Sequence, residues 1–296
     1  MSHVNLLHRH RNLISVLLEY RPEVVLLQEV LPWFAENLRA ASPLKEEYHI
    51  SPTQSASYGN LTLVRKEFAY SVGFEDIPLT TNMGRSCLLA TVQGQGSLGT
   101  MKVSCNILTT NADDFATLSK VTNIPSSATR FARKVANMHF ESLDSEALRK
   151  TQLREVHAAI LPNPTDNLPP RLVLLGGDFN FDDRQTWGDW VRSPFAEDDI
   201  VASSCPLENK NMEEIMQPDF ADAWLHLDKD SSRDQIRYTF DGNRNPNVKD
   251  GGEQMRYDRF LVARSAGIDS LEDIEILTPP DVSDHFGVKV TFNFNK

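Results

Sequence analysis

Acidic, amide and histidine side chains follow apolar runs at widely separated places in the sequence. The run VVLLQE ends in Glu29, LVLLGGDFN carries Asp178 and Asn180, and VSDH near the C-terminus carries Asp284 and His285. Carboxylate and carboxamide oxygens are hard ligands, so they suit Mg²⁺ or Mn²⁺ better than zinc. Histidine titrates near neutral pH and can exchange a proton with a reacting group. Together these residue types predict phosphodiester hydrolysis, which needs a Lewis acid, an oriented water and donors for developing charge.

Two further residues fit the same chemistry. His139 follows the strand-like run KVANM, and Asp258 lies inside the strand-like run RYDRFLV. A buried acid needs a partner, so Asp258 is hard to explain as an ordinary strand residue. Each of the others has a plain structural interpretation when taken alone: Glu29 as a strand reaching solvent, Gly-Asp-x-Asn as a turn, and His139 as a hydrogen-bonded core histidine. Their repeated position at strand ends favours one shared site.

Apolar runs and helical periods predict the elements that would position these residues. Residues 8–20 place apolar side chains on one helical face, and the helix should end at Arg21-Pro22. The near-continuous apolar runs at 23–29 and 171–175 predict strands covered on both faces. The remaining pattern predicts helices near 32, at 145–161 and at 219–227, and strands at 47–50, 59–65, 68–77, 86–93, 134–140, 236–241, 256–263 and 286–294. Interleaved strands and helices predict an α+β fold with two packed sheets and outer helices.

The stretch 94–133 differs from the rest of the chain. It is rich in Gly, Ser, Thr and Asn and has no sustained hydrophobic period. Long irregular segments are unusual inside a compact domain, so we expect an insertion or a disordered loop there. The remainder predicts a single domain over residues 1–296.

Composition limits the classes of partner. The formal net charge of -11 disfavours a protein that grips long duplexes through many phosphates, but it allows a short nucleic-acid end or another small phosphodiester as substrate. No apolar run approaches the roughly 18 residues of a membrane span, and no signal-peptide pattern opens the chain. Cys87, Cys105 and Cys205 are odd in number and far apart, so we expect buried thiols in a reducing, intracellular compartment, nucleus or cytoplasm. No pattern indicates the oligomeric state.

The order of these motifs resembles the endonuclease/exonuclease/phosphatase superfamily, to which DNase I belongs. In detail, LQEV, HFES, RYTFDGN, RYDRFLV and SDHFG are most similar to the tyrosyl-DNA phosphodiesterase 2 group. The resemblance runs from about residue 8 to the C-terminus and excludes 94–133. It implies a four-layer α/β/β/α sandwich of two mainly antiparallel sheets.

The resemblance also implies roles for the metal and the attacking water. Glu29 would bind the catalytic Mg²⁺ (or Mn²⁺), with Asp284 contributing nearby. Asp178 would orient or deprotonate the water, and Asn180 would help to hold the water and the phosphate.

The other implied roles concern the phosphoryl group and the substrate. His139 and His285 would donate to the phosphoryl oxygens, and Asp258 would fix the orientation and tautomer of His285. The substrate groove is expected to contain Tyr238, Phe240 and Arg256, although Tyr238 and Phe240 are about as well explained by packing within the sandwich, and Arg256 by structural pairing. For Arg259, surface pairing is the favoured interpretation.

Two departures from the family pattern bear on activity. Members begin with a strand that ends in a metal-site asparagine, but only 28 residues precede Glu29 here, and they match the helix after that strand. We therefore expect an N-terminally truncated domain, with two open strand edges and an incomplete metal site. Asp182 also stands where the tyrosyl-DNA group usually has a nucleic-acid-facing arginine.

Three functions remain open from the sequence. The first is a metal-dependent phosphodiesterase that acts on 5′-phosphotyrosyl DNA ends, which the HFES and R-x-D-R details favour. The second is a phosphatase or phosphodiesterase that acts on nucleotides, RNA ends or phosphorylated lipid headgroups, which the acidic charge and Asp182 favour. The third is a catalytically impaired binding protein of the same fold, which the missing asparagine favours.

Overall fold

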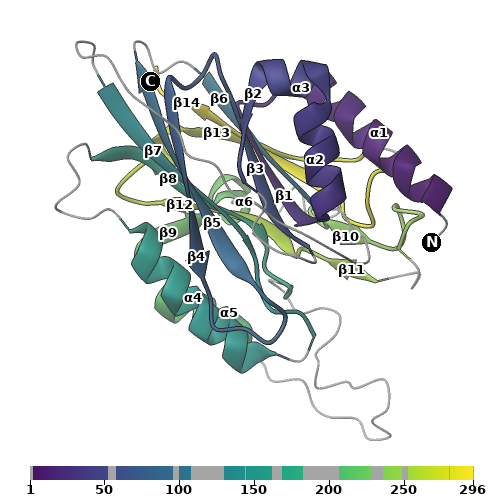
Figure 1. Ribbon diagram of the computed structural model, residues 1–296. Coiled ribbons are helices and arrows are strands. Elements are labelled where there is room, and N and C mark those ends of the chain that lie inside the picture. Colours follow the sequence, from purple (N-terminus) through teal and green to yellow (C-terminus); the bar gives the residue numbers. More distant parts are fainter. Residues whose placement is uncertain are drawn as a thin grey trace, which may run out of the picture.

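Two six-stranded sheets pack face to face, with helices on their outer faces (Figure 1). The computed structural model describes residues 3–52, 58–95, 100–107, 130–143, 145–161, 169–182, 207–228, 236–248, 253–279 and 281–295. The predicted α/β/β/α sandwich is confirmed.

The first sheet is built around the strand that carries Glu29. Its order is β13 (Leu271–Leu277), β14 (Gly287–Asn293), β6 (Thr100–Ile107), β1 (Val24–Val30), β3 (Gly59–Arg65) and β2 (Tyr48–Ile50). β1 and β6 are parallel, and the other neighbours are antiparallel. Its outer face is covered by α1 (His3–Tyr20), α2 (Pro32–Ala40) and α3 (Ser42–Glu47).

The second sheet carries most of the polar strand ends. Its order is β4 (Ser71–Pro78), β5 (Ser86–Gln95), β7 (Arg130–His139), β8 (Pro170–Asp178), β12 (Asp258–Ala263) and β9 (Phe220–Asp222). β7 and β8 are parallel. Its outer face is covered by α4 (Glu146–Ile160) and α5 (Leu207–Ile215). The smaller elements are α6 (Ala223–Leu227), β10 (Phe240–Asp241), β11 (Gln254–Met255), a 3₁₀ turn η2 (Ile268–Ser270) and the β10–β11 ribbon that the two short strands form.

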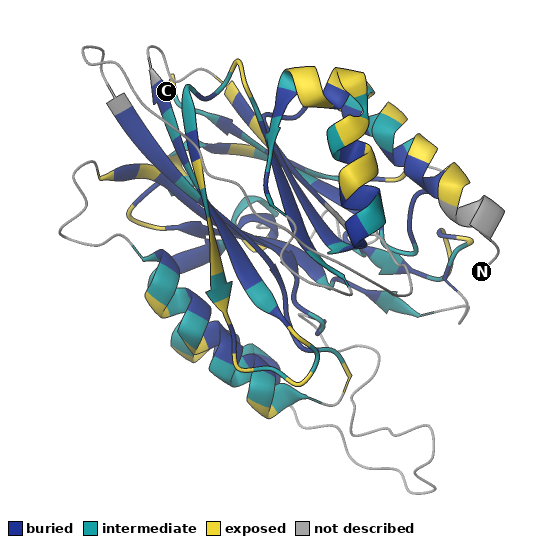
Figure 2. Ribbon diagram, in the orientation of Figure 1, coloured by how far each residue is buried: buried dark blue, intermediate teal, exposed yellow. Residues whose placement is uncertain are grey.

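The apolar runs become strands because both of their faces are covered. In β1, Val24 and Leu26 point between the sheets, whereas Val25 and Leu27 pack under the helices. All four side chains are fully buried, and each contributes about 1.5–3 kcal/mol relative to exposure. Figure 2 shows the same division across the fold, with buried strands and helices whose outer sides are exposed.

A buried carboxamide joins the two sheets. Asn137 on β7 accepts a hydrogen bond from Gln28 Nε2 at 2.6 Å, and its Nδ2 donates to the main-chain oxygens of Leu27 and Leu61 at 3.1 and 3.0 Å. Gln28 Oε1 in turn accepts from the Cys105 thiol at 3.2 Å. These bonds satisfy polar groups that would otherwise be costly to bury.

The sequence predicted that a strand is missing beside β1 and that two strand edges are left open. The prediction of open edges is wrong. Residues 100–107 and 130–133, within the stretch expected to be an insertion, form β6 and the start of β7. β6 pairs with β1 on one side and β14 on the other, so it occupies the place of a central strand and leaves neither edge open. The rest of that stretch, 96–99 and 108–129, lies outside the described residues.

Other differences between prediction and structure are local. The predicted helix at 219–227 is the short strand β9 followed by α6, and only Phe240–Asp241 of the predicted strand at 236–241 is extended. The sequence pattern did not predict α3, α5 or β13, which are short or amphipathic with few apolar residues. Cys87 and Cys105 are buried free thiols as predicted, and Cys205 lies outside the described residues. Among the described helices, none has the length and apolar character that crossing a bilayer requires.

Gly177 should be essential to the pairing of β7 and β8. A Cβ at this position would lie 1.8 Å from the Met138 main-chain oxygen, and the backbone φ is +144°. We expect Gly177→Ala to lower the free energy of unfolding by more than about 3 kcal/mol, measured by urea denaturation. Gly73→Ala is the matched control, because nothing lies within 4 Å of its Cβ position, and it should change stability by less than about 1 kcal/mol. Equal effects of the two substitutions would contradict this account.

Candidate active site

Three neighbouring strands of the second sheet bring polar residues to the same end of the sheet. In the register of the sheet, His139 at the end of β7 lies opposite Asp178 at the end of β8. Asp178 in turn lies opposite Asp258 at the start of β12. All three are buried. Each borders an apolar run in the sequence, so the polar cluster forms at the common edge where the apolar part of these strands stops.

Glu29 reaches the cluster from β1 of the other sheet. The β1–β3 register shifts between Leu27 and Val30, and Glu29 has a left-handed backbone conformation with φ of 55°. Such a conformation costs a non-glycine residue about 1–3 kcal/mol, so its surroundings must impose it. Glu29 Oε1 lies 3.9 Å from His139 Nε2, and the same nitrogen lies 3.4 Å from Asp178 Oδ2. The irregularity in β1 therefore aims a carboxylate of one sheet at the histidine of the other.

Asn180 turns the chain directly after β8. Its φ of 56° is a conformation that asparagine tolerates well. Its main-chain N–H donates to Asp178 Oδ1 at 2.7 Å, and its Nδ2 donates to the main-chain oxygen of Phe140 at 2.9 Å. These two bonds fix the Asp178 carboxylate and tie the turn to the end of β7.

His285 forms an ion pair with Asp258. Its Nδ1 lies 2.8 Å from Asp258 Oδ2, and its main-chain N–H donates to Ser283 Oγ at 3.1 Å. Burial alone would lower the pKa of His285, but the charge and hydrogen bond of Asp258 raise it to about 10. The ring therefore carries protons on both nitrogens at neutral pH, and Nε2–H is a second donor.

Asp284 lies in the same turn as His285. Its main-chain oxygen accepts from Asn245 Nδ2 at 2.9 Å, and its carboxylate accepts from Ser283 Oγ at 3.2 Å. The turn is thus held from the β10–β11 ribbon, where Thr239 also accepts the main-chain N–H of Phe286.

Arg85 fixes the tautomer of His139. Arg85 Nη1 lies 2.8 Å from His139 Nδ1, and Nη2 donates to Ser142 Oγ at 2.7 Å. A guanidinium has only donors, so Nδ1 must accept and the ring hydrogen must reside on Nε2. Burial, then the positive charges of Arg85 and His285, hold the pKa of His139 well below its usual value. His139 is therefore a neutral donor whose Nε2–H faces Asp178 and Glu29.

The carboxylates at this end oppose one another's ionisation. Burial, then Asp178, raises the pKa of Glu29 to about 7, and burial, then Asp258, raises the pKa of Asp178 to about 6. Asp284 adds to the negative potential at Glu29. A divalent cation relieves such crowding, and Mg²⁺ needs only one or two carboxylates because water and substrate oxygens complete its shell.

The donor set fits magnesium better than zinc. Within the described part of the chain, no three Asp, Glu, His or Cys side chains come together as a complete metal-binding group. The carboxylates of Glu29, Asp178 and Asp284 offer hard oxygen ligands, which suit Mg²⁺ better than zinc.

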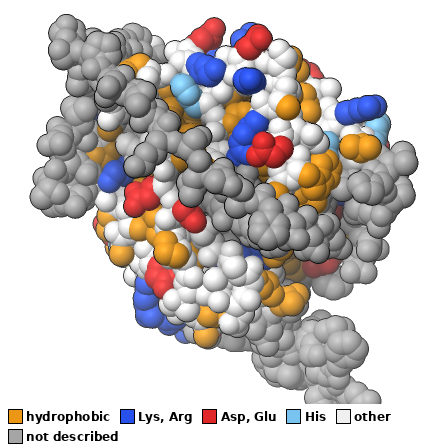
Figure 3. Space-filling view, viewed as in Figure 1, with side chains coloured by type: hydrophobic (Ala, Val, Ile, Leu, Met, Phe, Trp, Pro, Cys, Tyr) orange, Lys and Arg blue, Asp and Glu red, His pale blue; other side chains and the backbone are white. Residues whose placement is uncertain are grey.

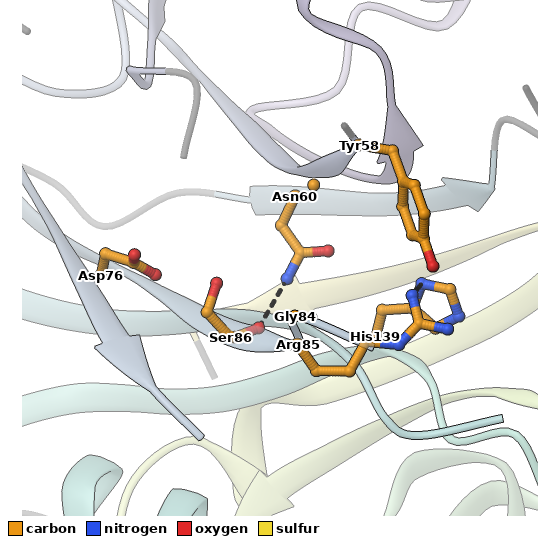
Figure 4. A pocket seen from close by; sticks show the side chains of 8 residues that line it. Tyr58, Asn60, Asp76, Gly84, Arg85, Ser86 and His139 are labelled. Carbon is orange, nitrogen blue, oxygen red and sulfur yellow. Dashed lines mark hydrogen bonds between the residues drawn. The ribbon is translucent and has the colours of Figure 1, made fainter. Parts of the chain in front are cut away.

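A pocket opens beside His139 (Figure 4). It has a volume of about 120 Å³ and is lined by Tyr58, Gly59, Asn60, Asp76, Gly84, Arg85, Ser86 and His139. The Arg85 guanidinium carbon lies 5.3 Å from the centre of the Tyr58 ring, within cation–π distance. An aromatic wall and a cation beside the histidine suit an aromatic or anionic group.

One of the three predicted substrate-binding residues, Phe240, lies beside His285 in the cluster. The Phe240 ring centre is 5.1 Å from that of His285, and Tyr257 completes an aromatic group at 5.9 Å from His285. Tyr238 is half-buried on the same segment, and its main-chain oxygen accepts from Arg244.

Arg256 and Arg259 are both buried, so Arg256 has the structural pairing that the sequence allowed, and the surface position favoured for Arg259 is wrong. Arg256 is 1% exposed and holds both Asp222 carboxylate oxygens, at 3.1 and 2.6 Å. Asp182 is buried as well and accepts the main-chain N–H of Arg256 at 2.8 Å, so the acid does not face a groove. Arg259 is 2% exposed and stacks 4.3 Å over the Phe181 ring. These charges pair with one another in the interior because each would be costly to bury alone.

Sequence reasoning missed Arg85 and Tyr58, which line the pocket beside His139. Both lie in irregular segments where neither period nor spacing marks them.

The sequence profile of the Endonuclease/Exonuclease/phosphatase family matches residues 3–285. No curated protein sequence is a significant match.

Solved structures resemble the chain in fold. D. rerio TDP2 complexed with a single-strand DNA product has a TM-score of 0.63 and 22% identity, over 99% of this chain and 94% of that one. C. elegans TDP2 has a TM-score of 0.60 and 20% identity, over 99% and 71%. The human Nocturnin catalytic domain with bound sulfate has a TM-score of 0.54 and 14% identity, over 97% and 86%.

Asp258→Asn should remove the charge of His285 at neutral pH. Without the carboxylate, burial dominates and the pKa of His285 should fall from about 10 to below its ordinary 6.5, as measured by NMR titration of the ring. In the parent, the ion pair stabilises the fold fully below about pH 6.5 and loses this contribution as the pH rises towards about 10. Asp219→Asn, which removes the partner of the distant His157, should leave His285 unchanged. An unchanged titration in Asp258→Asn would refute the assignment.

Proposed function

The chain belongs to the endonuclease/exonuclease/phosphatase family of phosphoric ester hydrolases, and from this we propose that it is a phosphodiesterase dependent on Mg²⁺ or Mn²⁺. The observation that carries the proposal is the meeting of Glu29, His139 and Asp178 at one edge of the two sheets, with atoms 3.4–3.9 Å apart. A buried acid and a half-buried acid, with pKa values of about 6 and 7, lie beside two histidines, which supports a hydrolytic site rather than a passive surface.

Glu29 and Asp284 would hold the metal ion. The charge of Asp284 contributes to raising the pKa of Glu29, and a cation bound by both acids would relieve this repulsion. When bound, the ion would act as a Lewis acid on a phosphoryl oxygen.

The protein residues would supply the water and the donors. Asp178, with a pKa of about 6, would orient the attacking water and accept its proton, and Asn180 would hold that carboxylate and the phosphate. His139, through its Nε2–H, and the charged His285 would donate to the phosphoryl oxygens as negative charge grows. Asp258 would keep His285 charged and oriented.

The pocket beside His139 would take the leaving group. Its Tyr58 wall and Arg85 cation suit a phenol that leaves as an anion, and the opposite side of the site offers Phe240 and Tyr257 for stacking on a base. We therefore propose a 5′-phosphotyrosyl nucleic-acid end as substrate. The single-strand DNA product held by D. rerio TDP2 supports this choice.

Affinity for long duplexes is not expected. On the face in Figure 3, the Lys and Arg side chains of the described residues form separate small groups among acidic ones. The formal net charge is -11, so counterion release would contribute little to binding. A short end that enters the pocket fits these charges better than a long helix.

The protein should hydrolyse a phosphotyrosyl diester only when Mg²⁺ or Mn²⁺ is present. Asp178→Asn and His285→Ala should each lower kcat at least about 100-fold, because each removes a proton acceptor or a charge-stabilising donor. Release of the phenol is measured by absorbance, with Asp219→Asn as a control that should retain activity. A folded parent without turnover on any ester would favour the catalytically impaired binding protein instead.

A substrate panel separates the phosphodiesterase alternatives. Phosphotyrosyl DNA ends should react faster than nucleotides, RNA ends or inositol phosphates. Preferential turnover of one of the latter would keep the chemistry but overturn the proposed substrate.

A further inference from the structure

The segment between β4 and β5 that carries Arg85 has no regular secondary structure. We call residues 79–85 the Arg85 loop. It forms one wall of the pocket through Gly84 and Arg85 (Figure 4). Because strand hydrogen bonds do not hold this segment, other groups must fix the position of the guanidinium against His139 and Ser142.

The buried carboxylate of Glu141 anchors the Arg85 loop. Glu141 is fully buried, and its Oε2 accepts from Thr81 Oγ1 at 2.7 Å while its Oε1 accepts from the main-chain N–H of Asn82 at 2.9 Å. Gln152 Nε2 donates to the same Oε2 at 3.2 Å. Hydrogen bonds to an ionised acceptor are roughly twice as strong as those between neutral groups. The carboxylate therefore anchors both the side chain of Thr81 and the backbone after it.

The Thr81 hydroxyl links Glu141 to the backbone of Arg85. Its Oγ1 donates to Glu141 and in turn accepts the main-chain N–H groups of Met83 and Arg85, both at 3.0 Å. This arrangement closes the loop into a compact turn, and Gly84 completes it with a φ of +75°. The turn delivers Arg85 Nη1 to within 2.8 Å of His139 Nδ1.

We propose that Glu141 is a positioning residue that acts through Thr81 on Arg85, and thereby sets the tautomer of His139 and the shape of the pocket. The proposal deepens the proposed function, on which its kinetic consequence rests. The tautomer of His139 follows from the geometry alone. The Glu141 carboxylate accepts hydrogen bonds from Thr81, Asn82 and Gln152. It acts on the site only through these neighbours, so it is a positioning residue.

The first test is spectroscopic and needs no substrate. Long-range ¹H–¹⁵N correlation spectra of the parent should show the His139 ring protonated on Nε2. In Glu141→Gln an amide replaces one acceptor that faces donors, so the loop should loosen and the ring should become a mixture of tautomers. An unchanged Nε2 tautomer in a folded Glu141→Gln protein would overturn the proposal.

The second test is a double-mutant cycle with Arg85→Ala. We expect Glu141→Gln to lower kcat/KM for the phosphotyrosyl diester about 10- to 100-fold in the parent, but less than about 2-fold in the Arg85→Ala background. Losses that multiply in the double mutant would mean that Glu141 does not act through Arg85. A parent without turnover would defeat the proposed function, and the spectra would still decide the proposal.

Matched variants separate positioning from stability. Glu155→Gln is the control, because Glu155 holds Thr80 at the start of the same loop but does not contact Thr81 or Arg85. It should retain both the tautomer and nearly all activity. If Glu141→Gln does not fold, Thr81→Val removes the relay hydroxyl at constant volume and should mimic the loss, whereas Thr81→Ser should restore it. Equal behaviour of the valine and serine variants would refute the relay.

Discussion

The Asn137 carboxamide is the contact on which both halves of the site depend. It lies between the sheets and binds Gln28, together with the main-chain oxygens of Leu27 and Leu61. β1 loses its register with β3 after Leu27, and Asn137 satisfies carbonyls that this irregularity leaves between the sheets. The irregularity is what turns Glu29 towards His139, which lies two residues beyond Asn137. The Asn137 side chain therefore helps to fix the separation of the sheets at the point where the candidate catalytic groups meet.

The charges in the site also depend on buried contacts. Glu29 and Asp178 are acids whose pKa values are raised by burial and by neighbouring carboxylates. The positive charges that oppose them come from two sides, His285 held by Asp258 and Arg85 held by its loop. His285 is positioned by Asp258, and in our proposal Arg85 is positioned by Glu141 through Thr81. Under the proposed function, the excess of negative charge would attract a divalent ion, and the fixed donors would face a phosphoryl group.

Sequence reasoning found the residues that strands carry directly. A strand buried on both faces must be apolar, so Glu29 and Asp178 are visible as the polar residues where such runs stop. Arg85 was not visible, because its position depends on contacts with His139 and Ser142, which lie more than 50 positions away in the chain. For Arg256 the sequence left substrate contact and structural pairing open, since its partner Asp222 belongs to a strand that the pattern did not separate from α6.

β6 shows why the order of motifs is a weaker guide than the order of strands. Its sequence lies in a Gly- and Ser-rich stretch, and its buried apolar residues among 101–105 are Met101, Val103 and Cys105. Without β6, β1 and β14 would each have one unpaired edge inside the packed sheet. A strand between them is required to satisfy the hydrogen-bonding groups of both edges. β6 meets this need whether it precedes or follows β1 in the chain, since only spatial neighbours exchange hydrogen bonds. A site assembled at strand ends can therefore form when the order of its strands along the chain changes. A comparison that expects the motifs in a fixed order does not recognise such a strand.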